Sequence, residues 1–112
     1  MPVTCSEKNG AAILVLDGEL MGGPDARLLT DKLHELAAAG RKHIVVDLAA
    51  VDRMNSSGLG ILIGGLTAIR NQGGDLKLVR VGKKPLELLR ITKLERVFEI
   101  YPDEDQAIAS FA

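Results

Sequence analysis

Residues 43–60, HIVVDLAAVDRMNSSGLG, decide the fold that we predict for this chain. Residues 43–48 are strongly apolar, as is typical of a buried strand, and residues 49–55 connect them to a helix. From Leu59 onward, apolar residues recur at three- and four-residue steps, which is the period of an α-helix. Gly73-Gly74 then supplies the end of that helix. A strand that leads into a helix in this way predicts one unit of an α/β sheet.

A hairpin and a first helix are predicted on the N-terminal side of this unit. Residues 3–7 alternate weakly, and residues 12–16 form an apolar run typical of a strand buried on both faces. Between them, Lys8-Asn9-Gly10 predicts a tight turn because Asn and Gly tolerate positive φ. Pro24 suits the first turn of the helix that follows, and Asp25 suits the positive end of its dipole.

Strands and helices continue to alternate on the C-terminal side. Residues 76–81 and 97–101 are predicted to be strands, and residues 85–91 and 106–111 are predicted to be helices. Strands that alternate with helices predict an α/β fold class with a largely parallel sheet. We therefore expect a single domain over residues 1–112, with a mostly parallel sheet of about four to five strands, an N-terminal antiparallel hairpin and about four helices.

The composition excludes several classes of partner. The net charge is −1, from fourteen basic and fifteen acidic side chains, and the aromatic residues are one Tyr and two Phe. A nucleic-acid surface needs a strongly basic face or a platform of aromatic rings, so we expect no nucleic acid as a partner. The longest apolar run, residues 58–66, is too short to cross a bilayer. We expect no direct membrane insertion and a location in the cytoplasm.

Neither a metal nor another cofactor is expected. Cys5 is the only cysteine, which excludes an internal disulfide. His34 and His43 have no second ligand at metal-binding spacing, so we interpret both as structural or solvated. The Gly58-x-Gly60 pair meets Ile63 where a dinucleotide fingerprint requires its third glycine.

The loop at residues 54–60 is the candidate site. In an open α/β sheet, binding sites form at the carboxyl ends of strands, and this loop follows one. Ser56 and Ser57 lie where free backbone N–H groups and the helix dipole favour negative charge. A simpler interpretation is that a serine only caps the helix. Nothing in the sequence brings a histidine base beside Ser56, so catalysis by a serine nucleophile is poorly supported.

At this point the chain resembles the STAS (sulphate transporter and anti-sigma antagonist) domains of anti-sigma factor antagonists. The resemblance rests on five segments in order: Gly18-Glu19-Leu20, Val46-Asp47-Leu48, Met54-Asn55-Ser56-Ser57-Gly58-Leu59-Gly60, Gly73-Gly74-Asp75-Leu76 and Leu88-Leu89-Arg90-Ile91-Thr92-Lys93-Leu94. The family usually has Asp where this chain has Asn55, and Asp where it has Met21. Both differences remove a carboxylate from the surface that would meet a partner.

The resemblance implies a switch that works by binding. Ser56 would be the phosphoacceptor, with Ser57 as second choice, and an anti-sigma factor serine kinase that uses ATP would be the partner. Unphosphorylated antagonist would bind that kinase and free the sigma factor, and phosphate would end the binding. The expected partner-binding residues are Met21, Gly22, Gly23, Met54, Asn55, Ser57, Gly58, Leu59 and Gly60.

Two other functions remain open on the sequence. One alternative is a non-phosphorylated STAS scaffold in a signalling complex or a lipid-transport assembly. The other is a small nucleotide-binding enzyme that uses residues 56–60. The missing carboxylates favour the scaffold, whereas the serine at position 56 favours the switch. The absence of a metal or base constellation in the sequence weighs against the enzyme. As an isolated chain, we expect a monomer or a weak dimer.

Overall fold

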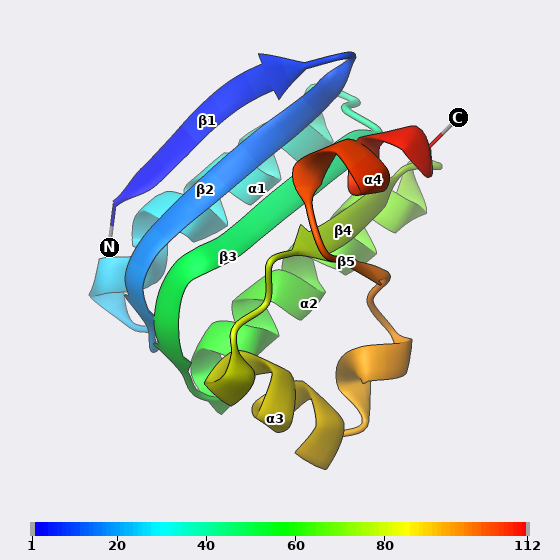
Figure 1. Ribbon diagram of the computed structural model, residues 1–112. Coiled ribbons are helices and arrows are strands. Elements are labelled where there is room, and N and C mark those ends of the chain that lie inside the picture. The colour runs from blue at the N-terminus through cyan, green and yellow to red at the C-terminus, as the bar shows by residue number, and fades with distance from the viewer. Residues whose placement is uncertain (1, 112) are drawn as a thin grey trace.

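The computed structural model describes residues 2–111, which form a five-stranded sheet with four α-helices (Figure 1). The strands are β1 (Val3–Lys8), β2 (Ala11–Leu20), β3 (His43–Met54), β4 (Asp75–Val79) and β5 (Ile100–Tyr101). The helices are α1 (Arg27–Ala38), α2 (Ser56–Asn71), α3 (Lys83–Ile91) and α4 (Glu104–Ala109), with 3-10 turns η1 (Pro24–Ala26) and η2 (Leu94–Arg96). The spatial order is β1-β2-β3-β4-β5, antiparallel for β1–β2 and parallel elsewhere. The predicted fold class is confirmed.

The hairpin forms where the sequence predicts it. Asn9 and Gly10 have φ of 51° and 85°, so the two residues of the turn both adopt left-handed conformations. This is the backbone that a two-residue hairpin turn needs to match the twist of its strands. Lys8 pairs with Ala11 beside the turn, and the pairing then runs without a shift to Val3 opposite Leu16.

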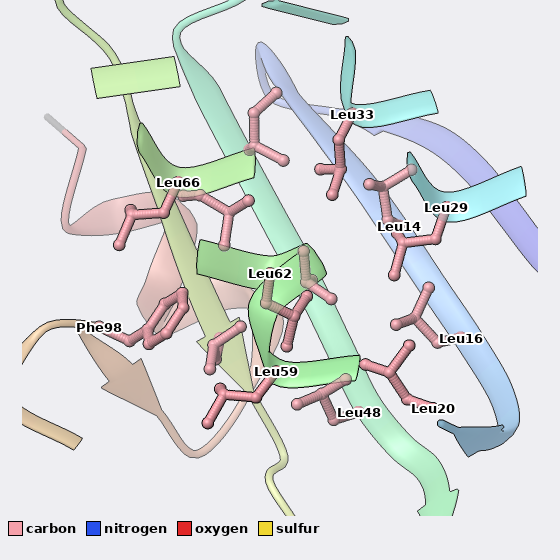
Figure 2. Packing of buried hydrophobic residues seen from close by; sticks show 14 of the residues in the cluster. Leu14, Leu16, Leu20, Leu29, Leu33, Leu48, Leu59, Leu62, Leu66 and Phe98 are labelled. Carbon is pink, nitrogen blue, oxygen red and sulfur yellow. The ribbon is translucent and has the colours of Figure 1, made fainter. Parts of the chain in front are cut away.

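The main core lies between the sheet and the pair α1 and α2, which cover the same face (Figure 1). Figure 2 shows leucines from both helices pointing at leucines from β2 and β3. Fully burying one such side chain contributes about 1.5–3 kcal/mol. The two helices approach closely at Gly65, where the lack of a side chain leaves room for Leu33. A Cβ at Gly65 would lie 2.7 Å from the Leu33 Cδ1 atom. The residues labelled in this cluster are Leu14, Leu16, Leu20, Leu29, Leu33, Leu48, Leu59, Leu62, Leu66 and Phe98.

The opposite face of the sheet carries a smaller apolar cluster, and α4 lies over part of it (Figure 1). Ala107 of α4 packs there with Ile13, Val45 and Val79. Buried Lys77 extends beneath α4, where its Nζ donates to Ser110 Oγ at 2.5 Å. Because the apolar cluster on this face is small, polar contacts such as the Lys77–Ser110 hydrogen bond also hold α4 against the sheet.

The last strand is shorter than predicted. Residues 97–101 were expected to be one strand, but only Ile100–Tyr101 pair with β4. Phe98 instead turns into the main core after the η2 turn, which fixes the backbone there before β5 begins. The strand β3 is longer than predicted and reaches Met54, because residues 50–54 pair with the end of β2.

A buried carboxylate connects β3 to the end of β4. Asp47 is fully buried, and both of its oxygens accept hydrogen bonds from Arg80 Nε, at 3.2 and 3.1 Å. Burial, the largest single influence, raises the pKa of Asp47. The hydrogen bonds from Arg80, Glu104 and the Ala49 N–H, together with the charge of Arg80, outweigh it, and the pKa lies below its ordinary value. The hydrogen bond shared with Asp47 raises the pKa of Glu104 on α4. Arg80 has a φ of 51°, a left-handed conformation that is strained for a residue other than glycine.

We predict that Asp47→Asn lowers the free energy of unfolding at pH 7 by about 1–3 kcal/mol, because a charge-assisted hydrogen bond is lost. A carboxyl whose pKa is lowered by folding stabilises the protein above its unfolded pKa, and that contribution is lost as the pH falls through the folded pKa. The difference between wild type and variant should therefore shrink below about pH 4. Urea unfolding of both proteins at several pH values measures this difference in the free energy of unfolding.

Asp52→Asn is the matched control, because Asp52 lies on the same strand and is exposed. It should change stability little at any pH. An Asp47→Asn deficit that is as large at about pH 3 as at pH 7 would contradict the proposed role of the carboxylate charge.

Candidate functional site

The loops that follow β2 and β3 meet at one edge of the sheet. The last residues of these strands, Leu20 and Met54, are direct partners in the parallel pairing. The next residue, Asn55, donates its backbone N–H to the Leu20 carbonyl at 3.3 Å. The predicted site at the carboxyl end of the strands is therefore assembled from two loops, residues 21–23 and residues 55–57.

Asn55, and not a serine, caps helix α2. It is extended, with φ of −114°, and its Oδ1 accepts a hydrogen bond from the Gly58 N–H at 2.9 Å. The interpretation that a serine serves only as the cap is wrong, because Ser56 and Ser57 are the first two helical residues. Both are exposed, and neither hydroxyl is needed to close the helix terminus.

Two glycines allow the loops to touch. A Cβ on Gly58 would lie 2.0 Å from the Leu20 carbonyl oxygen, which is far inside the van der Waals contact distance. A Cβ on Gly22, whose φ is 79°, would lie 2.6 Å from the Ser57 Cβ. Gly58 in the first turn of α2 is therefore packed backbone to backbone against the end of β2, and Ser57, the residue before it, lies against Gly22 of the β2–α1 loop.

The predicted partner-binding residues separate into exposed and buried groups. The structure exposes Met21, Gly23, Ser56, Ser57 and Gly60, and leaves Gly22, Met54 and Asn55 half-buried. Gly58 and Leu59, which are also among the predicted partner-binding residues, are buried. Leu59 is 2% exposed and belongs to the main core, as its place in the helical stripe of the sequence already indicated.

The exposed surface carries no acidic residue in the first turn of α2. Free N–H groups at a helix N-terminus and the helix dipole both favour negative charge there. The nearest ion pair along the strands is Glu19–Arg53, at 3.5 Å, and both side chains are more than half exposed. Sequence reasoning missed this pair, although the parallel register of β2 and β3 places the two residues side by side.

A shallow depression adjoins the β2–α1 loop. Its volume is about 490 Å³. It begins at Gly23, next to the glycine that contacts Ser57, and continues along the outer face of α1. The lining residues are Gly23, Pro24, Arg27, Thr30, Asp31 and His34. A partner that covers the two loops would therefore find further polar side chains along α1.

His43 and Cys5 lie apart from this surface, whereas His34 lies on α1 in the depression that adjoins it. Within residues 2–111, no group of three His, Cys, Asp or Glu side chains could hold a metal ion. His43 stacks on Phe111 with ring centroids 4.5 Å apart, at the start of β3 and not at its end. Cys5 is exposed on the edge strand β1. None of the helices described here is long and apolar enough to cross a membrane.

The fold and this edge define a class: a small α/β domain that presents an exposed serine at a helix N-terminus beside a glycine loop. The chain belongs to the STAS domain family, whose model matches residues 3–107.

Similar proteins and solved structures agree with this family. The anti-sigma-B factor antagonist of Bacillus subtilis (strain 168) is 35% identical over 75 residues, which are 67% of this chain and 68% of that protein. The anti-sigma F factor antagonist of Paenibacillus polymyxa is 26% identical over 108 residues, covering 96% of this chain and 92% of that protein. The crystal structure of a candidate anti-sigma factor antagonist from Thermotoga maritima superposes with a TM-score of 0.88 at 26% identity, over 96% of this chain and 92% of that one.

We predict that Gly58→Ala destabilises the domain by about 1–3 kcal/mol, because overpacking a tight contact forces the backbone to shift. Gly60→Ala is the matched control two residues later in the same helix, where a Cβ would meet nothing within 4 Å. It should raise stability by about 0.5–1 kcal/mol, since alanine favours helix over glycine. Thermal unfolding of the two variants beside wild type measures both effects. Equal stability of Gly58→Ala and Gly60→Ala would show that the contact with Leu20 does not constrain the site.

Proposed function

We propose that this protein is an anti-sigma factor antagonist that works by binding and not by catalysis. Its partner is an anti-sigma factor serine kinase in the cytoplasm, and the contact surface is the edge formed by residues 21–23, residues 55–57 and Gly60. The names of the relatives from Bacillus subtilis and Paenibacillus polymyxa support this role. Ser56 is the residue that the kinase phosphorylates.

The observation that carries the proposal is the division of roles between Asn55 and Ser56. Asn55 supplies the cap through its Oδ1, so the Ser56 hydroxyl is exposed and free of a structural task. At the first helical position, a phosphate on Ser56 would also lie near free N–H groups and the positive end of the dipole. The site therefore accepts the modification without loss of the helix terminus.

In the transfer step, the Ser56 hydroxyl oxygen forms a bond to the γ-phosphorus of ATP, and the bond from that phosphorus to the leaving ADP breaks. The hydroxyl proton passes to a base of the kinase. This chain contributes only the acceptor oxygen and its geometry, because no base lies among the residues that form the edge.

The phosphate would end binding through its charge. Phosphorylation adds about −1.5 to −2 charges at pH 7. The residues of the two loops and Gly60 are uncharged, and Met21 at 40% exposure is an exposed apolar side chain among them. A dianion in such an interface must be desolvated without a partner, which is costly. The helix dipole offsets only about 0.3–1 kcal/mol at an exposed position, so the interface is lost while the fold remains.

One observation favours the scaffold function as the second candidate. Asn55 provides the cap without a carboxylate, and Met21 adds an exposed apolar side chain to the same edge. A surface of this kind suits a permanent contact in a larger signalling or lipid-transport assembly, in which Ser56 would stay unmodified.

We predict that Ser56→Asp weakens binding to the anti-sigma factor kinase more than about tenfold, which is 1.4 kcal/mol, while the melting temperature changes little. Ser56→Ala should bind like wild type and should take no phosphate, because the hydroxyl is needed only for modification. Calorimetric titration measures binding, and peptide mass spectrometry after incubation with kinase and ATP locates the phosphate. Since an acidic side chain is an imperfect mimic, phosphorylated wild type is titrated in parallel.

Thr67→Asp is the matched control, because Thr67 is exposed on the same helix but away from its N-terminus. It should bind as wild type does. Phosphate on Ser57 alone would overturn the assignment of Ser56. Full binding by both Ser56→Asp and the phosphorylated protein would favour the scaffold.

A further inference from the structure

The strand β1 is an open edge of the sheet, and we propose that it pairs with β1 of a second copy of this chain, antiparallel and centred on Cys5. The resulting dimer would join the two sheets into one. The contact lies at the strand β1, one strand beyond the β2 end that carries the candidate site. It is therefore independent of the function proposed for Ser56.

The hairpin decides which backbone groups of β1 are free. Lys8 and Ala11 flank the two-residue turn, and such flanking residues exchange hydrogen bonds, as does every second residue along the strands. At the far end, the Pro2 carbonyl accepts from the Asp17 N–H at 3.2 Å, which keeps the same alternation. The residues that direct their N–H and C=O groups away from β2 are therefore Val3, Cys5 and Glu7.

A second copy centred on Cys5 satisfies all of these groups at once. In an antiparallel register with Cys5 opposite Cys5, Val3 lies opposite Glu7 of the second copy, and each pair is of the hydrogen-bonded type. On the other face, Thr4 lies opposite Ser6, a pairing that favours cross-strand contact. No two like charges face each other along the strand, so the strand is complementary to itself.

The charges that would protect this edge already have partners within the chain. Natural edge strands avoid pairing through charged side chains, prolines, bulges or short length. Here Glu7 is bound by Arg41, with two hydrogen bonds of 2.9 and 2.6 Å, and Lys8 is paired with Asp105 at 2.7 Å. The pairing of β1 with β2 has no bulge. The middle of the edge is therefore uncharged and regular.

The opposite edge of the sheet lacks these properties. The strand β5 has two residues, and Pro102, which has no N–H to donate, follows it directly. A strand this short offers little backbone for pairing, so β1 is the edge that a second copy would use.

Apolar surface flanks the open edge on the α1 side. Leu28 is 63% exposed, and a depression of about 200 Å³ lies between it and the strand, lined by Val3, Cys5, Leu28 and Lys32. A second copy on the edge would cover this depression. One strand and a single leucine bury little area, and small interfaces give weak complexes, so the dimer should form only as concentration rises.

The test is sedimentation velocity of the full chain over a wide concentration range, with two substitutions at the centre of the pairing. Wild type and Cys5→Ser should both shift from monomer toward dimer as concentration rises. Cys5→Lys should remain monomeric, because it places two positive charges opposite each other at the dimer axis. Asn71→Lys adds the same charge at an exposed position outside the edge and should dimerise like wild type.

A short bifunctional thiol reagent provides a second readout, because Cys5 is the only cysteine. It should link wild-type chains into covalent dimers faster than random collisions between monomers would. Unfolding in 6 M urea should reduce the rate of cross-linking to that of random collisions. Wild type that is monomeric at every concentration would overturn the proposal. So would a dimer that persists in Cys5→Lys, because its interface would then lie elsewhere. Circular dichroism shows that each variant is folded.

Discussion

The candidate site depends on one close approach, that of Gly58 in α2 to the carbonyl group of Leu20 at the end of β2. A side chain on Gly58 would place its Cβ 2.0 Å from that oxygen, so no other residue keeps the two backbones in place. The same carbonyl accepts the Asn55 N–H, and the Asn55 side chain accepts the Gly58 N–H. These contacts fix the first turn of α2 against the β2–α1 loop. They turn two loops from different parts of the sequence into one surface, with Ser56 exposed on it.

Much of the fold could be predicted from the sequence because its signals are local. The Asn9-Gly10 turn, the apolar strands and the helical stripe through Leu62 and Leu66 each act over a few residues. The same stripe includes Leu59, so periodicity places that residue in the core, whereas the prediction that it contacts a partner came from the motif. The cap could not be assigned from sequence, since asparagine and serine are equally suited to it. Pairing of β3 with β2 as far as Met54 decided it.

Contacts between residues that are far apart in the sequence could not be predicted from local patterns. Arg80 reaches Asp47 across 33 positions, and neither residue indicates the other in sequence. The shortened last strand has a similar cause: residues 97–101 are mostly apolar, but tertiary packing takes Phe98 into the core before the pairing with β4 begins. The two faces of the sheet thus differ in kind. Leucine packing from α1 and α2 stabilises one face. On the other face, the Lys8–Asp105 ion pair, the Lys77–Ser110 hydrogen bond and a small apolar cluster hold α4 and the residue after it.

The central claim is that the two loops act as one surface for an anti-sigma factor. The most direct measurement is a titration of the ¹⁵N-labelled protein with that anti-sigma factor, followed by amide chemical shifts. We predict that shifts or line broadening concentrate at residues 21–23, residues 55–57 and Gly60, and that both loops respond together. Changes centred on other elements, with these amides unaffected, would contradict it.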